Sequence, residues 1–398
     1  MPITVPVDDA AIAHLLAAAA EKFVPVGDTL ALDCAAHGPR LRSVLEAGQA
    51  ALAAGTAPWT LSFAEWETRI ETLRRLAADT LFEGDVDGVA MVPSAAFALA
   101  TAARNLPLGT GDAVLVLDGQ FPSNLLPWQQ RCTETGAHVV AARRVHGQDW
   151  TEAVMQAWDA TPKVRVVAVP HAHWHDGALL DLERISQRAC GQEVAWVLDL
   201  SQSLGALPVL LARWQPDFIA AVGHKWLLGP HGLAWLWAAP RWREQGVALD
   251  QHWQARAAGD RWAFPIDTPP PYRRGARRFD AGGVADPVRL AMAAAAMGQL
   301  HAWGVANISR SLGALTTQLD HALEAQGLSS WITPGHAPHF TALRAPDDRQ
   351  LELAANALSR EGVICTRRAG LLRIAPHLHV GSDDMSRVSR IVAAAVQA

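Results

Sequence analysis

The hydrophobic residues of this chain follow a helical period in some stretches and form short continuous runs in others. Residues 8–22 and 63–82 carry apolar side chains at helical spacing, and the second stretch begins after Ser62, a typical N-cap residue. Runs of β-branched and apolar residues follow, of the length expected for buried strands. We predict seven strands, at 88–92, 113–117, 138–142, 164–169, 194–198, 218–222 and 232–237. Because helical or turn segments separate most of them, they predict a mostly parallel sheet with helices on both faces.

A stretch rich in Pro, Arg and Gly at residues 260–283 interrupts this rhythm and is typical of a loop or linker. Helical patterns near 286–303 and 308–326 follow, and then a smaller region of helix and strand that ends at 371–374. We therefore predict a large α/β domain over residues 31–283 and a small α+β C-terminal domain over residues 284–398. Residues 1–30 are expected to form an N-terminal segment that packs on the small domain.

Composition and charge narrow the class of partner. The chain has 398 residues, half of them hydrophobic, which is enough to bury a large core and to form two domains. Its formal net charge is -5 and its pI is near 6.3, so it presents no overall basic field. Nucleic acid and anionic membranes are therefore not expected as main partners, and the expected ligand is a small molecule.

Cysteine usage and the N-terminal residues bear on the compartment. Four cysteines are scattered without CxxC spacing, which argues against a zinc site and against a disulfide framework. The first residues contain acids where a signal peptide needs a basic region, and the alanine run is too short and interrupted to span a membrane. We expect a cytoplasmic protein that is not exported.

Two residues at predicted strand ends carry the chemistry. Asp199 ends the apolar strand near 194–198, and Lys225 follows the strand at 218–222, 26 residues later. An open parallel sheet binds ligands at the carboxyl ends of its strands. A lysine amine can form a Schiff base with pyridoxal phosphate, and a carboxylate can keep its pyridine nitrogen protonated. Taken singly, Asp199 could instead be a helix N-cap and Lys225 a surface lysine, but their spacing favours the cofactor.

Two motifs around these residues resemble a known family. DLSQSLG at 199–205 and GHKWLLGPHG at 223–232 resemble the class V aminotransferases of fold-type I pyridoxal 5'-phosphate enzymes. That family also includes cysteine desulfurases, kynureninases, isopenicillin N epimerase-like proteins and hercynylcysteine sulfoxide lyases. The resemblance runs from about residue 32 to residue 392 and implies the fold-type I transferase fold. It also implies that Lys225 forms the Schiff base, that Asp199 pairs with the pyridine nitrogen and that Gln202 donates to the ring 3-oxygen.

Further cofactor contacts are implied by the resemblance. Phe121, in GQFPSNLLPW, matches the residue whose ring stacks on the cofactor, and His224 matches a phosphate contact beside the lysine. Val222 stands where the family commonly has a serine, so one phosphate hydrogen bond is expected to be missing. A turn before a predicted helix resembles the phosphate-binding turn, in which backbone N–H groups at a helix N-terminus hold an anion. That turn consists of Ser94, Ala95 and Ala96.

The loop at 278–283 resembles the family segment that reaches the phosphate of the neighbouring subunit. Gly283 stands where a threonine is usual, so only a backbone contact is expected there. The resemblance therefore implies a homodimer whose active site lies at the subunit interface.

The substrate side is implied by other positions. Arg373 matches the arginine that grips the substrate α-carboxylate, and His37 and Trp174 are expected beside the substrate. His173 occupies the place of an asparagine near the ring 3-oxygen in many relatives, so we predict a catalytic role for it. His171, His173 and His175 lack a defined set of metal-ligand spacings, and we predict no metal site.

The reaction type depends on fewer signals. Cys365 lies eight residues before Arg373 among β-branched neighbours, which predicts a buried thiol on a strand and disfavours a desulfurase. The HWHDG and FPSN patterns resemble the epimerase-like and sulfoxide lyase branch. We therefore expect a carbon–sulfur β-lyase that acts on an amino acid through an external aldimine and a carbanion, releasing pyruvate and ammonia. A class V aminotransferase or an amino-acid epimerase are the alternatives, and a binding subunit without turnover is a more remote one.

Overall fold

The computed structural model describes residues 15, 16, 18–145, 147–257 and 267–397. Residues 8–14 and 17 of the predicted N-terminal helix at 8–22 lie outside the described residues. Of the rest of that stretch, residues 15, 16 and 18–20 are helical. The predicted helix at 63–82 is confirmed as α3 (Phe63–Leu81). Ser62 caps it, because its hydroxyl accepts from the Glu65 backbone N–H while the Glu65 carboxylate accepts from the Ser62 backbone N–H.

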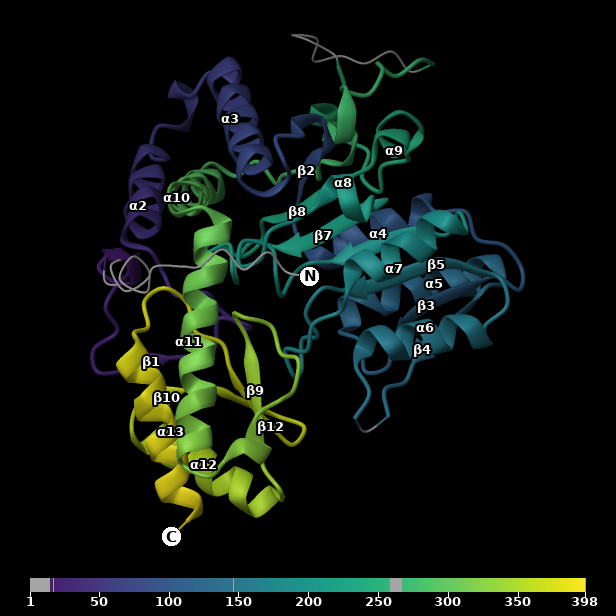
Figure 1. Ribbon diagram of the computed structural model, residues 1–398. Coiled ribbons are helices and arrows are strands. Elements are labelled where there is room, and N and C mark those ends of the chain that lie inside the picture. The colour runs from purple at the N-terminus through teal and green to yellow at the C-terminus, as the bar shows by residue number, and fades with distance from the viewer. Residues whose placement is uncertain (1–14, 17, 146, 258–266, 398) are drawn as a thin grey trace.

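A seven-stranded sheet forms the centre of the large domain (Figure 1). The strands from β7 to β4 pair in parallel, whereas β8 pairs antiparallel with both β2 and β7. In sheet order they are β2 (Val89–Val92), β8 (Ala234–Ala238), β7 (Phe218–Val222), β6 (Ala195–Asp199), β5 (Val164–Pro170), β3 (Ala113–Leu117) and β4 (His138–Ala142). The predicted mostly parallel sheet is therefore confirmed, and three of the seven predicted strands match to the residue.

Helices cover both faces of this sheet because its central strands are apolar on both sides. Alternate strand residues pack into two separate hydrophobic clusters, one with α4 (Ala95–Asn105) and α5 (Leu126–Thr135). The other includes residues of α6 (Trp150–Ala160) and α7 (Leu182–Gly191). Polar caps begin three of these helices and direct the chain off the strand ends. The caps are Ser94 for α4, Asp149 for α6 and Asp181 for α7.

The C-terminal region forms a smaller α+β unit. Its antiparallel sheet has the order β11 (Thr366–Arg368), β12 (Leu371–Ile374) and β9 (Thr341–Arg344). Three helices accompany it, α11 (Val305–Ala325), α12 (Asp348–Arg360) and α13 (Ser382–Val396), and α13 contacts both others. A two-stranded parallel sheet joins β1 (Leu30–Ala31) to β10 (Val363–Ile364). The predicted fold class, with a smaller C-terminal α+β domain, is confirmed.

The domain boundaries predicted at 30/31 and 283/284 stay predictions. Residues on opposite sides of each boundary are in contact with each other. Ala31 pairs with Ile364, and Asp33 bridges to Ala375, so the start of the predicted large domain contacts small-domain strands. In Figure 1, α10 (Pro287–Trp303) lies beside α2 (Arg42–Ala54), and it packs on both α2 and α3. The two units are thus connected by shared packing as well as by the chain.

The predicted linker at 260–283 is only partly a loop where it is described. It contains the 3-10 helix η5 (Gly275–Phe279), and Asp280 forms an ion pair with the buried Arg74 of α3. No helix among the described residues combines the length and apolar character needed to cross a membrane. The remaining short helical segments are η1 (Pro58–Thr60), η2 (Val86–Gly88), η3 (Pro122–Asn124), α8 (Leu211–Trp214), α9 (Pro240–Gln245), η4 (Trp253–Ala255) and η6 (Ser329–Trp331).

Candidate active site

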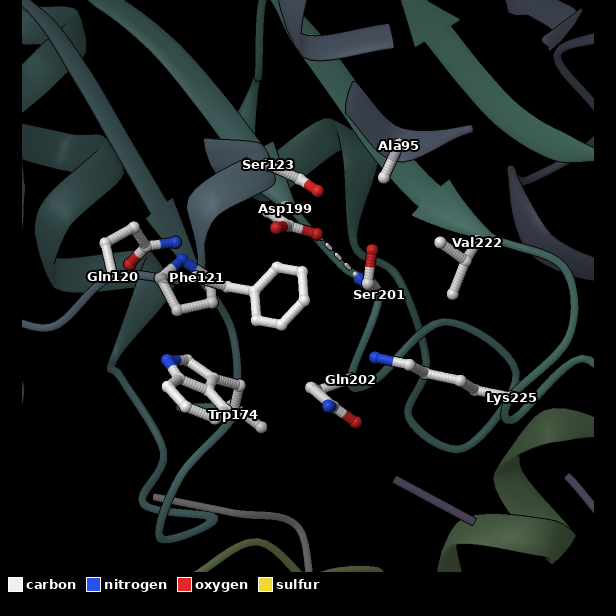
Figure 2. Close-up of a pocket in the computed structure, with 12 residues that line it drawn as sticks. Ala95, Gln120, Phe121, Ser123, Trp174, Asp199, Ser201, Gln202, Val222 and Lys225 are labelled. Carbon is white, nitrogen blue, oxygen red and sulfur yellow. Dashed lines mark hydrogen bonds between the residues drawn. The ribbon is translucent and has the colours of Figure 1, made fainter. Parts of the chain in front are cut away.

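A cavity of about 410 Å³, including its open mouth, lies where β5, β6 and β7 end and α4 begins (Figure 2). This is the place at which parallel sheets bind ligands. Both aromatic and titratable side chains line it. They are Ala95, Gln120, Phe121, Ser123, Pro170, Ala172, Trp174, Asp199, Ser201, Gln202, Val222 and Lys225.

Lys225 follows β7 and extends its amine into the cavity (Figure 2). The Nζ atom lies 5.6 Å from the centre of the Phe121 ring. Burial lowers the pKa of Lys225 to about 8, although the Asp199 carboxylate raises it and Arg373 lowers it further. A lysine with such a pKa carries an appreciable neutral fraction near neutral pH and is a competent nucleophile.

The backbone of Lys225 is held by close packing with the N-terminal loop. The Gly38 N–H donates to the His224 carbonyl at 2.9 Å. A Cβ atom at Gly38 would lie 2.2 Å from the Lys225 carbonyl oxygen, so the close approach requires a glycine.

Asp199 is the last residue of β6 and is buried in the cavity wall. Its Oδ1 accepts from the Ser201 backbone N–H at 3.0 Å. Burial raises the pKa of Asp199, while the Ser201 hydrogen bonds and the Lys225 charge oppose that increase. Turns follow Asp199, so the alternative of a helix N-cap is wrong. A buried carboxylate in this position is suited to a cationic ligand atom.

Gln202 is fixed by three hydrogen bonds. Its Nε2 donates to the Ala35 carbonyl at 3.0 Å, and its Oε1 accepts from Trp226 Nε1 at 3.1 Å. Its backbone carbonyl lies 2.5 Å from Nε2 of the fully buried His339. Burial lowers the pKa of His339 to about 3, so a neutral ring with its proton on Nε2 makes this bond. One N–H of the Gln202 amide remains for a ligand. Sequence reasoning missed His339, which lies 137 residues from Gln202.

The turn predicted to hold a phosphate begins α4. Ser94 uses its hydroxyl to accept from the Phe97 backbone N–H, so the hydroxyl is the helix cap. The backbone N–H groups of Ala95 and Ala96 belong to the unpaired first turn, which favours an anion. Ala95 and Val222 line the cavity at this end (Figure 2).

Seven predicted site residues do not line the cavity: Ser94 and Ala96 of the turn before α4, His173 and Arg373, which are described below, and His224, His37 and Gly283. The His224 ring stacks on His231 with centres 3.8 Å apart, and the His37 ring lies 5.5 Å from His231. Burial lowers the pKa of His224 to about 3, and His231, Lys225 and His37 add to the effect. Sequence reasoning missed His231. The predicted phosphate contacts of His224 and Gly283 stay predictions.

The cavity suits pyridoxal phosphate on the chemistry of its lining. Two buried polar atoms in the lining have no partner among the described residues, Ser201 Oγ and Gln120 Oε1. They accompany a buried carboxylate, a lysine with a lowered pKa and a helix N-terminus, which match a pyridine nitrogen, an aldehyde and a phosphate respectively. Asp199, Lys225 and the first turn of α4 would hold the cofactor, with Phe121 positioned for ring contact.

Arg373, the predicted carboxylate clamp, is buried at the side of the site. Its Nη2 donates to Asp33 Oδ1 at 3.0 Å, its Nη1 donates to the Trp174 carbonyl at 3.3 Å, and its Nε has no partner among the described residues. Trp174 itself lines the cavity and donates from Nε1 to the Gly119 carbonyl at 2.9 Å. The Phe121 and Trp174 rings meet edge to face at 5.5 Å. Asp33 is a further residue that sequence reasoning missed.

His173 lies outside the cavity lining, unlike its neighbours Ala172 and Trp174. Its ring centre is 4.7 Å from that of Trp150, and its Nδ1 lies 2.9 Å from Asp176 Oδ1. Burial opposes ionisation of Asp176, but hydrogen bonds and charges from His173 and Arg144 outweigh it and lower the Asp176 pKa. The structure therefore does not bring His173 to the other catalytic candidates. The neighbours Ala172 and Trp174 line the cavity, whereas the His173 ring packs against Trp150.

The two flanking histidines have separate surroundings. His171 packs edge-on against Trp214, and burial lowers its pKa to about 4. His175 Nε2 lies 3.1 Å from the Arg368 carbonyl oxygen. Within the described ranges, no group of three or more His, Cys, Asp or Glu is arranged to hold a metal ion.

Cys365 corrects one prediction. It lies between β10 and β11 and is half-buried, so it is neither within a strand nor fully buried. Burial raises its pKa to about 11, and the Asp33 charge contributes. A short β11–β12 hairpin through Ala369 and Gly370 connects it to Arg373.

A family profile described as aminotransferase class-V matches residues 31–393. The chain belongs to the class V aminotransferase family. It is accordingly a pyridoxal 5'-phosphate-dependent enzyme, of the lyase or aminotransferase type, and the predicted family and cofactor are confirmed. An uncharacterized aminotransferase of Bacillus subtilis (strain 168), YcbU, is 27% identical over 315 residues, which cover 79% of this chain and 80% of YcbU.

Other relatives of this class V chain match over shorter stretches. Isopenicillin N epimerase of Streptomyces clavuligerus is 27% identical over 230 residues, 56% of this chain and 54% of the epimerase. A probable cysteine desulfurase of Pyrococcus abyssi (strain GE5 / Orsay) is 27% identical over 174 residues, 42% of each chain. These matches span about half of the relatives' length.

Solved structures support the fold. A mutant of the protein C-DES with glycine linked covalently to its PLP cofactor has a TM-score of 0.82 at 18% identity, covering 94% of this chain and 98% of that one. A cysteine desulfurase from Thermococcus onnurineus NA1 has a TM-score of 0.79 at 17% identity, covering 96% and 98%. At these identities the likeness shows the fold alone.

Proposed function

We propose that this class V enzyme is a carbon–sulfur β-lyase that converts a sulfur-linked amino acid to a thiol, pyruvate and ammonia. The observation that carries the proposal concerns the thiols near Arg373. Neither Cys365, which lies in a short connection between two strands, nor the buried Cys34 lines the cavity. Burial also raises the pKa of both thiols, that of Cys365 to about 11. Neither is suited to accept sulfur as a thiolate at neutral pH, so sulfur would leave with the departing group.

The charged residues fit the steps of such an elimination. Pyridoxal phosphate, when bound, supplies an electron-accepting ring joined to the substrate nitrogen. Lys225 Nζ, with its lowered pKa, would take the proton from Cα and pass one to the leaving sulfur. Asp199 would keep a proton on the ring nitrogen, and Arg373 would hold the α-carboxylate. Overall, RSCH2CH(NH3+)COO- and water give RSH, pyruvate and NH4+, which balances without an oxidant or reductant.

An aminotransferase is the second candidate. YcbU, a relative matched along four-fifths of its length, carries that name. Transamination would use the same proton abstraction by Lys225 but would return the proton to a different carbon and would require a keto acid.

We further propose that the enzyme is a cytoplasmic homodimer. Gly283 has a φ of +74°, a Cβ atom built on it would have no described atom beyond its chain neighbours within 4 Å, and it does not line the cavity of its own chain. This position suits a backbone contact to a partner's site. Sedimentation of the purified protein would test the dimer, and a species at the mass of one chain would contradict it. Cell fractionation would test the location, and recovery outside the cytoplasmic fraction would contradict that.

The lysine content makes the cofactor claim simple to test. The chain contains three lysines, Lys22, Lys163 and Lys225, and the first two are exposed. Incubation with pyridoxal phosphate, borohydride reduction and peptide mapping should label Lys225 and neither of the other two lysines. Lys225→Ala should remove the yellow absorbance, whereas Lys22→Arg and Lys163→Arg should keep it. A parent protein that stays colourless with added cofactor would refute the proposed function.

The reaction type is tested by pyruvate release from sulfur-bearing amino acids, with and without a keto-acid acceptor. We expect release without the acceptor, accompanied by one equivalent of thiol. Strict dependence on the acceptor would support the aminotransferase and overturn the lyase.

A further inference from the structure

One face of the small-domain sheet carries a row of arginines. In antiparallel strands, residues directly opposite each other point to the same side. Arg344, Leu371 and Arg368 are opposite one another across β9, β12 and β11. Arg373 lies two residues after Leu371 on β12 and shares its face. Arg344, Arg368 and Arg373 therefore project from the same side of the sheet, and we call them the arginine row.

The arginine row lies beside the mouth of the cavity. Arg373 donates to the Trp174 carbonyl, and the Arg368 guanidinium carbon lies 5.8 Å from the centre of the Trp174 ring, which lines the cavity. The adjacent His175 contacts the Arg368 carbonyl oxygen. Burial lowers the pKa of His175, and the Arg344 charge adds to that decrease, which places Arg344 near the same segment.

The charges of the arginine row are not balanced within the described part of the chain. Arg373 is paired with Asp33. Arg344 and Arg368 are exposed and have no carboxylate partner there. Three cations and one anion leave two positive charges, and the α-carboxylate of an amino acid accounts for only one.

We propose that the arginine row selects amino acids whose side chain ends in a second carboxylate. Arg373 receives the α-carboxylate, while Arg368 and Arg344 receive the distal one at the mouth. The chain between the two carboxylates runs past the aromatic walls, Phe121 and Trp174. This inference rests on the proposed function, since it assigns the substrate class of the same site.

Matched amino acids without a β-leaving group provide the test, because they should bind without elimination. The probes are aspartate, glutamate and 2-aminoadipate, each compared with the monocarboxylate of equal length, namely 2-aminobutyrate, norvaline and norleucine. Binding to the cofactor-loaded enzyme is measured by the change in cofactor absorbance. Two exposed guanidinium–carboxylate contacts should make at least one dicarboxylate bind about three- to tenfold more tightly than its partner at low salt.

A neighbouring arginine provides the matched control. Arg367 is opposite Leu372, so it projects from the other face of the sheet. In R344Q/R368Q the dicarboxylate should bind no more tightly than the monocarboxylate of equal length, and monocarboxylate binding itself should be unchanged. The R367Q variant should keep the parent's preference for the dicarboxylate. The inference is overturned if no dicarboxylate is preferred, or if R367Q removes the preference as fully as the double variant. If the protein still binds cofactor and monocarboxylates normally in those cases, the proposed function stands without the inference. If the cofactor absorbance is absent, both the proposed function and the inference are refuted.

Discussion

The lowered pKa of Lys225 leads to a quantitative prediction for cofactor attachment. Only the neutral amine attacks the aldehyde of pyridoxal phosphate, so the attachment rate should follow the neutral fraction of Lys225. Burial in the cavity holds that pKa at about 8, compared with 10.5 for an ordinary lysine. The neutral fraction rises with pH, and the rate should therefore rise and level off above about pH 8.

The expected size of the effect follows from the two pKa values. At pH 7 about a tenth of an amine with a pKa of about 8 is neutral, compared with about 0.03% at 10.5. Attachment at pH 7 should therefore be about 300-fold faster than the neutral fraction of an ordinary lysine would allow. At pH 10 the two neutral fractions differ only about fourfold.

The assay is stopped-flow absorbance of the cofactor-free protein mixed with excess pyridoxal phosphate between pH 6 and pH 10. Nα-acetyl-lysine in the same buffers corrects for ionisation of the cofactor itself. The double variant Lys22→Arg, Lys163→Arg leaves Lys225 as the one lysine and should give the same profile. A rate that continues to increase tenfold per pH unit up to pH 10 would show that the cavity does not lower the Lys225 pKa.

Three further substitutions test the other parts of the site. Burial raises the pKa of Asp199 in the folded protein above its pKa in the unfolded chain. The stability that this carboxyl contributes is therefore fully present below the unfolded-state pKa and is lost as the pH rises through the folded-state pKa. The cofactor-free Asp199→Asn protein should therefore resist urea better than the parent at pH 7, although it loses activity when loaded. Gly38→Ala places a methyl group against the Lys225 carbonyl, so it should lower the free energy of unfolding in urea by about 1–3 kcal/mol and lower the cofactor content. A variant with the parent's unfolding free energy and cofactor content would contradict the close packing. His173→Phe should lower the free energy of unfolding by about 1–3 kcal/mol, because it removes a partner of Asp176, while kcat changes less than about twofold. A large fall in kcat at unchanged stability would support the catalytic role predicted from the sequence.

Local pattern determined much of this fold. Buried strands must be apolar, and that requirement places the strands at 113–117 and 218–222 without reference to the rest of the chain. The strand at 138–142 lies at the sheet edge with only Ala142 buried, and its run of apolar residues is what predicts it. The requirement for apolar buried strands also places Asp199 and Lys225 at strand ends, where the parallel sheet brings them into one cavity. The position of a strand along the chain depends on residues that are neighbours in sequence, so it can be predicted from the sequence alone.

Only the tertiary structure decided which side chains face the ligand. His173 and Trp174 are adjacent in sequence, yet Trp174 lines the cavity whereas the His173 ring is buried against Trp150. His339 reaches Gln202 across 137 residues, and Asp33 reaches Arg373 across 340. Such contacts arise from the packing of two domains, and side-chain direction changes with a single residue of register. The sequence by itself therefore determined the sheet, the lysine and its acid partner, whereas packing determined how their neighbours are held and which charges remain for a substrate.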